Sequence, residues 1–130
     1  GCDPITVAVQ SKQSSIISYL LKKKCDINHK DINNETPLMW SSFDGDNKMM
    51  EILLNRKADV NHIGEIRNNT ALTWATERGH FECVKLLLEK NSNVNEYVML
   101  KTLQMSEKYP RIFSWVAKTI EEKKTEKKNK

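Results

Sequence analysis

The sequence has few cysteines, and their spacing excludes both a disulfide framework and a zinc site. Cys2, Cys25 and Cys83 form no Cys-x-x-Cys pair and no cluster with histidine. Cys25 and Cys83 stand among apolar residues, where a reduced cysteine behaves as a small hydrophobic side chain. We therefore expect an intracellular protein, in the cytoplasm or nucleus, with no metal site and no cofactor.

A long apolar run is missing as well. No stretch approaches the roughly eighteen consecutive apolar residues that a membrane-spanning helix needs, so the sequence predicts no membrane span. Hydrophobic residues still make up 38 % of the 130 residues. That content is too high for a wholly disordered chain, and the length suits one compact domain.

Arginine, the residue favoured for bidentate phosphate recognition, is scarce. Four arginines stand beside seventeen lysines, and the formal net charge is +4. Residues 121–130 supply +2 of this charge through five lysines and three glutamates. The pattern disfavours nucleic acid as a partner, and any such binding would run through this tail and fall steeply with salt.

Catalytic signatures are absent from the sequence. No HExxH, Walker-type or GxGxxG pattern occurs, and no serine or cysteine has an interpretable histidine partner. His29 and His62 follow equivalent asparagines, and His80 follows a glycine, so all three fit structural roles. The sequence therefore predicts that the chain is not an enzyme.

What the chain does contain is an internal repeat of 33 or 34 residues. Asn28, Asn61 and Asn95 close three similar four-residue segments and are spaced by 33 and 34 residues. Thr36 and Thr70 each precede a helical run and are suitable N-caps. Periods of this length are typical of proteins built from stacked supersecondary units.

Apolar residues within each unit follow the spacing of paired helices. Ile5 and Ala8 are three positions apart, as are Leu38 and Ser41 and also Leu72 and Ala75, so each pair lies on one face of a first helix. A second amphipathic helix follows in each unit, and the three apolar stripes are Ile16-Ile17 with Leu20-Leu21, Met49-Met50 with Leu53-Leu54, and Cys83-Val84 with Leu87-Leu88. One helix pair cannot bury its own apolar face, so the units should stack into a continuous core.

These features resemble the ankyrin-repeat family. The matching landmarks are Thr-Pro-Leu at 36–38, Ala-Asp-Val-Asn at 58–61 and Gly-His at 79–80. The resemblance implies an all-α solenoid of stacked helix-turn-helix units with short β-hairpin-like fingers. We expect three repeats over 1–95 (about 1–27, 28–60 and 61–94), a degenerate helical C-terminal cap over 96–120, and a disordered Lys/Glu-rich tail over 121–130.

The sequence also departs from the family pattern. Thr6, Met39 and Thr73 replace the motif histidine, and Lys12 stands where the later repeats have a glycine, which predicts a strained turn. Gly1 aligns two residues before the threonine landmark, so the first finger is missing. We expect a segment of a larger protein rather than a cloning scar.

The resemblance implies non-catalytic protein–protein recognition by a monomeric scaffold or adaptor domain. A protein or peptide would dock on the concave face of the inner helices and on the finger tips. The candidate partner-binding residues are Trp40, Phe43, Trp74 and Glu77 in the groove, and His29, Lys30, Asp31, Ile63 and Glu65 in the fingers. The family resemblance also makes Asn61 a candidate for asparagine hydroxylation.

Trp40 and Trp74 occupy the same position in successive repeats, and two interpretations stand open. They either fill space between repeats, which is the commoner role, or contact a ligand. The alternative function is a methyl-lysine (histone tail) reader, because indole faces attract cations and Glu77 follows nearby. The stretch 72–77 partly resembles ankyrin domains of histone lysine methyltransferases, although Glu35 and Asn69 stand where that cage has a further tryptophan.

Overall fold

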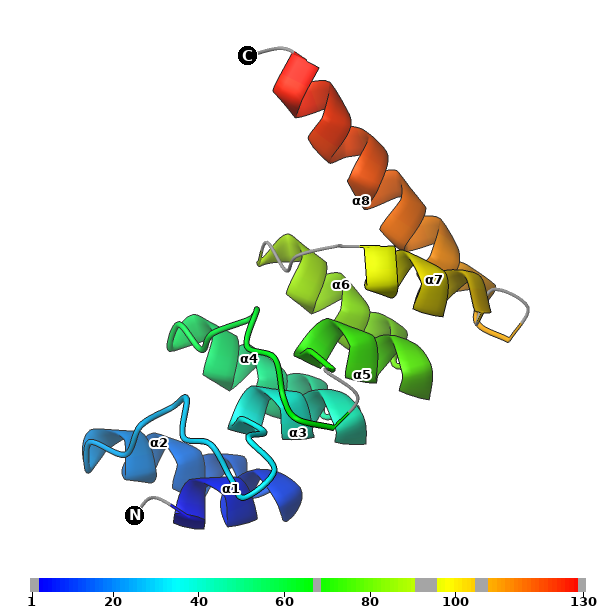
Figure 1. Ribbon diagram of the computed structural model, residues 1–130. Coiled ribbons are helices and arrows are strands. Elements are labelled where there is room, and N and C mark those ends of the chain that lie inside the picture. The colour runs from blue at the N-terminus through cyan, green and yellow to red at the C-terminus, as the bar shows by residue number, and fades with distance from the viewer. Residues whose placement is uncertain (1–2, 67–68, 91–95, 105–107, 129–130) are drawn as a thin grey trace.

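The computed structural model describes residues 3–66, 69–90, 96–104 and 108–128, and its helices stack in pairs (Figure 1). The helices are α1 (Asp3–Gln10), α2 (Ser14–Lys22), α3 (Pro37–Asp44), α4 (Asn47–Asn55), α5 (Ala71–Arg78), α6 (Phe81–Glu89), α7 (Glu96–Gln104) and α8 (Pro110–Lys128). No strand occurs within these ranges. The predicted all-α solenoid is confirmed.

The helices form two layers that run along the stack (Figure 1). The inner helices α1, α3, α5 and α7 each contact the next inner helix, and the outer helices α2, α4, α6 and α8 do the same. Each inner helix also packs against the outer helix that follows it. Every unit therefore buries its apolar face against its neighbours, as a solenoid requires.

The repeated apolar positions form the core. Ile5, Leu38 and Leu72 of the inner helices are buried, as are their partners three residues later. The outer-helix stripes are buried at Ile17, at Met49, Met50, Leu53 and Leu54, and at Cys83, Val84, Leu87 and Leu88, whereas Ile16 is exposed. The predicted helix faces therefore point inward, although in the first repeat Leu20 and Leu21 are only half-buried against the core.

The helix starts follow from their capping residues. The Thr36 side chain accepts a hydrogen bond from the Met39 backbone N–H at 3.4 Å, and Pro37 occupies the first helical position. Thr70 and Thr73 form a reciprocal capping box at the start of α5. Thr73 thus replaces the motif histidine with a local hydrogen-bond network, while Met39 places a buried apolar side chain there.

The fingers are hydrogen-bonded loops rather than paired strands. The Asp31 N–H donates to the Glu35 carbonyl at 3.0 Å, and the Gly64 N–H donates to the Asn69 carbonyl at 2.9 Å, so both loops close like hairpins. The Asn28 side-chain oxygen accepts a hydrogen bond from the Asp59 N–H at 2.8 Å. That bond links the first unit to the second.

Left-handed backbone marks the turn between paired helices. Gly45 and Gly79 adopt φ of 71° and 74°, and Lys12 adopts φ of 59° at the equivalent place. The predicted strain at Lys12 is confirmed, because a side chain disfavours this region of the backbone map. A Cβ at Gly45 would collide with the His80 ring, and one at Gly79 with the Tyr109 ring. Tyr109 therefore packs on the third repeat much as His80 packs on the second.

Helices α7 and α8 form the last described helix pair and pack on α5 and α6. Helix α8 contacts α6 and α7 and buries Ile112 and Val116. The sequence predicts that order ends near residue 121, whereas α8 continues through Lys128 and its last turns extend beyond the stack (Figure 1). Glutamate and lysine are good helix formers, and this segment has no glycine or proline to end the helix. Residues 92–95, the third landmark, and 129–130 lie outside the described residues.

Candidate functional site

A cavity of about 180 Å³ opens between α3, α5 and the second finger. Its lining residues are Glu35, Met39, Trp40, Phe43, Ile66 and Trp74, and we call it the aromatic cavity. Three of the four predicted groove residues thus surround one space. A concave apolar pocket with a single polar group is the usual form of a small binding site.

The three aromatic rings meet edge to face. The Trp40 and Phe43 centroids are 5.9 Å apart with planes at 72°, and the Phe43 and Trp74 centroids are 5.1 Å apart with planes at 81°. Phe43 therefore stands between the two indoles, which do not stack on each other. The Arg78 guanidinium lies 4.2 Å from the Phe43 ring centroid and covers that ring.

Both indole N–H groups bond to carboxylates of the first finger. Trp40 Nε1 donates to Asp31 Oδ2 at 2.8 Å, and Trp74 Nε1 donates to Glu35 Oε2 at 3.4 Å. Asp31 Oδ1 also accepts from the backbone N–H groups of Asn33 and Glu35, both at 2.9 Å. Asp31, predicted as a partner contact, thus holds the finger and Trp40 in place.

Glu35 is the polar group of the cavity, and its role was missed from the sequence. The residue is 3 % exposed, and its Oε1 atom has no hydrogen-bond partner among the residues that the structure describes. Burial raises the pKa of this carboxyl above its ordinary value, with Asp31 adding to the rise, while the Trp74 hydrogen bond and His62 oppose it. The site therefore contains a buried acid that is poorly solvated.

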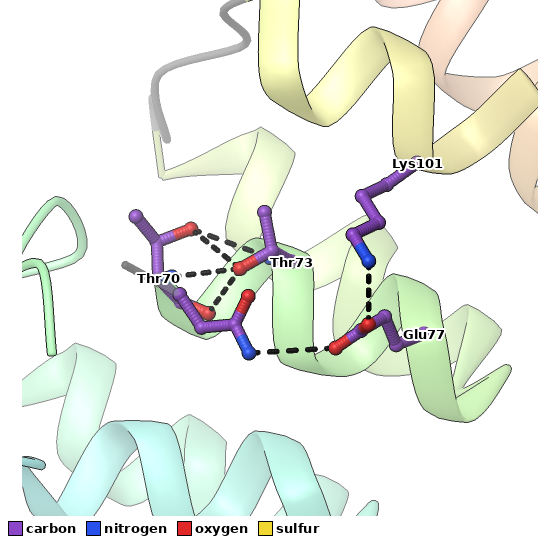
Figure 2. Close-up of polar contacts among 5 residues, drawn as sticks. Thr70, Thr73, Glu77 and Lys101 are labelled. Carbon is purple, nitrogen blue, oxygen red and sulfur yellow. Dashed lines mark hydrogen bonds and ion pairs between the residues drawn. The ribbon is translucent and has the colours of Figure 1, made fainter. Parts of the chain in front are cut away.

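Glu77 does not reach this cavity. Its Oε1 atom pairs with Lys101 Nζ of α7 at 2.8 Å, and its Oε2 atom accepts from Asn69 Nδ2 at 3.4 Å (Figure 2). The side chains of Lys101 and Glu77 are 17 % and 12 % exposed, so the pair is largely shielded from water. Glu77 thus joins the third repeat to α7 instead of supplying a carboxylate to the two indoles.

Comparison with known proteins decides the family. A model described as ankyrin repeats matches three copies over residues 1–97. The chain belongs to the ankyrin-repeat family. Ankyrin repeats are generally protein-interaction modules, and the family is typically non-catalytic.

A viral ankyrin protein is similar to part of the chain. Ankyrin repeat protein FPV244 of fowlpox virus (strain NVSL) is 40 % identical over 55 residues. The match covers 42 % of this chain and 8 % of the viral protein. The chain therefore spans a small part of that relative's length.

The remaining candidate residues lie along the ankyrin fingers. Ile63 is 54 % exposed, Lys30 and Glu65 are exposed, and His29 is half-buried. The two fingers touch, because Asn34 Nδ2 donates to the Ile63 carbonyl at 3.3 Å and the Glu65 N–H donates to the Asn33 carbonyl at 3.3 Å. Ile63 and Glu65 therefore present their side chains from a loop that is fixed by its neighbour.

Asn61 follows the second ankyrin landmark and is exposed. Its backbone N–H donates to Asp59 Oδ1 at 3.0 Å, which forms a local turn. In the part of the chain that the structure describes, no three His, Cys, Asp or Glu side chains are grouped as a metal site would need. Among the same residues, no helix has both the length and the apolar character required to cross a bilayer.

Proposed function

We propose that this ankyrin domain is a non-catalytic scaffold or adaptor module of a larger intracellular protein. It acts as a monomer and binds a protein or peptide, with nucleic acid disfavoured. The observation that carries the proposal is the aromatic cavity, in which Trp40, Phe43 and Trp74 converge on the inner-helix face. Tryptophan is enriched at binding hot spots, and a half-buried indole on a rigid helix loses little entropy on binding.

The exposed finger extends the proposed docking surface. Ile66 lines the cavity and is 37 % exposed, and Ile63 is exposed on the same loop. His29 and Lys30 on the first finger and Glu65 on the second would offer polar contacts to the partner. A central aromatic pocket with a polar rim is the usual anatomy of a protein interface.

The test compares Trp40→Ala with Tyr19→Ala, which truncates an exposed aromatic side chain on the outer helix α2. The immobilised wild-type domain should capture proteins that Trp40→Ala no longer captures and Tyr19→Ala still does. Thermal unfolding of each variant is measured alongside. Loss of stability with full retention of the captured proteins would make Trp40 a packing residue and defeat the groove proposal.

A second candidate function, recognition of methylated lysine, is favoured by the same cavity. Three aromatic rings surround a space that also contains the Glu35 carboxylate, and aromatic rings attract methylated ammonium groups. Glu35, rather than Glu77, would supply the negative charge. Titration with peptides that carry unmethylated, monomethylated or dimethylated lysine decides the point, because equal or absent binding to all three would eliminate this function.

A further inference from the structure

A second hollow lies on the outer layer of the stack, between α6 and α8. It has a volume of about 380 Å³ and is shallow and open. Its lining residues are Phe81, Pro110, Arg111, Ser114, Trp115 and Lys118, and we call it the α6–α8 hollow. None of these residues belongs to the aromatic cavity, so this surface is independent of the function proposed above.

The α6–α8 hollow combines two aromatic rings with three cations. Phe81 and Trp115 meet edge to face at 6.1 Å and 82°. The Arg111 guanidinium lies 4.1 Å from the Phe81 centroid, while Lys85 and Lys118 place their ammonium groups 5.3 Å and 5.5 Å from the Trp115 centroid. Cation–π contacts of this kind hold the charged ends near the rings.

Among the described residues, no carboxylate lies within ion-pair distance of these three cations. Over residues 3–66, 69–90, 96–104 and 108–128, no ion pair involves Arg111, Lys85 or Lys118. A guanidinium that stacks on a ring keeps its N–H edge available for bidentate bonding to a carboxylate. Three like charges gathered around two rings repel one another, and a bound anion would relieve that repulsion.

We propose that the α6–α8 hollow binds a short acidic peptide segment of a partner protein. Charge complementarity carries the inference, because the lining residues include two cations and no carboxylate and Lys85 adds a third cation. Adjacent carboxylates of the segment pair with Arg111 and Lys118. A neighbouring apolar side chain of the segment packs on Trp115 and Pro110.

The flanks of the hollow favour a peptide over a nucleic acid. Glu82 lines the adjoining hollow together with Arg111. Glu121, Glu122 and Glu126 line the surface that follows Lys118 along α8. A nucleic acid carries a phosphate at every nucleotide and would meet carboxylates on both sides. A peptide can confine its acidic residues to the centre of the hollow.

The probe is a fluorescein-labelled decapeptide of sequence SGSLEELSGS, measured by fluorescence anisotropy against the whole chain. Its counterpart with glutamine in place of both glutamates should bind about tenfold more weakly, because two exposed ion pairs are lost. The double variant Arg111→Gln/Lys118→Gln should weaken binding of the acidic peptide by a similar factor. The indole N–H signal of Trp115 should shift in NMR spectra on peptide addition, while that of Trp40 should not.

The matched control is Lys22→Gln/Lys23→Gln, which removes the same net charge at the other end of the stack, where Lys23 lies over Tyr19. This variant should bind the acidic peptide like the wild type. All four substituted side chains are on the surface, and circular dichroism verifies that each variant is folded. Equal weakening by the control pair, tighter binding of a ten-nucleotide single-stranded oligo(dT), or no binding of the acidic peptide would each overturn the proposal.

Discussion

Glu35 places a carboxylate in an apolar cavity, where one of its oxygens has no hydrogen-bond partner in the described part of the chain. Burial raises the pKa of the folded-state carboxyl above that of the unfolded chain. Between those two pKa values, the folded protein holds a proton that the unfolded chain has lost. The free energy of unfolding therefore falls as pH rises through that interval, and the cost persists at higher pH.

The first prediction concerns Glu35→Gln, which replaces the ionisable carboxyl group with a neutral amide. A glutamine oxygen can still accept from Trp74 Nε1 without carrying a charge into the cavity. At acidic pH the free energy of unfolding of the variant should equal that of the wild type. As the pH rises above the ordinary glutamate pKa, the variant should become the more stable of the two proteins. Urea unfolding from about pH 4 to about pH 8 measures the difference, and parallel pH profiles for the two proteins would contradict it.

The second prediction concerns Lys12, whose side chain occupies left-handed backbone at φ of 59°. Lys12→Gly should raise the free energy of unfolding by about 0.5–1 kcal/mol, because relief of backbone strain exceeds the added entropy of the unfolded chain. Glu51→Gly, on the exposed face of α4, should instead lower it by about 1 kcal/mol. Chemical denaturation of both variants gives the comparison, and a loss of stability in Lys12→Gly would refute the strain argument.

At the scale of elements, α7 is attached to the third repeat by a polar contact. Glu77 of α5 and Lys101 of α7 approach to 2.8 Å in a shielded position (Figure 2). The third prediction is a coupling energy of about 1 kcal/mol between them, which lies between the values of exposed and buried pairs. A double-mutant cycle of Glu77→Gln and Lys101→Gln measures it. Additive effects of the two substitutions would show that the pair does not hold α7 in place.

The repeat pattern predicts those elements whose packing recurs in every unit. Leu38 and Leu72 share one environment, so their common spacing reports the inner helices directly. The Glu77–Lys101 pair occurs once, and no periodic signal marks it. Glu35 is similar, because its burial depends on Trp74 of the following repeat, 39 residues away. The repeat pattern therefore predicts the stack of helices, but it does not predict contacts that occur once between two units.

The same reasoning explains the end of α8. The apolar residues that contact the stack stop at Ile120, and the absence of such residues afterwards predicts disorder from the sequence. Helix propensity acts without tertiary contacts, and Thr125 Oγ1 donates to the Glu121 carbonyl at 3.0 Å within the projecting turns. Hydrophobic pattern predicts where a helix packs, whereas propensity governs how far it continues.

At the scale of the whole molecule, stability is shared among neighbouring units. Leu72 is fully buried in α5, which contacts α3, α6 and α7. Val116 is buried in α8, which contacts α6 and α7 at one end of the stack. In a solenoid the free energy of unfolding is approximately a sum of contributions from each unit and from each interface between units. The position of a substitution therefore decides which units it destabilises.

The fourth prediction compares Leu72→Ala with Val116→Ala by hydrogen exchange. Leu72→Ala should cost about 3 kcal/mol and lower amide protection throughout α3–α8, because it leaves a cavity in a unit that both flanking units pack against. Val116→Ala should lower protection in α7 and α8 and leave α3 and α4 nearly unchanged, since the end of a stack can open separately. A uniform loss of protection along the chain with Val116→Ala would show that all units unfold as one, and the two proposed binding surfaces, on α3–α5 and on α6–α8, could not then be perturbed independently.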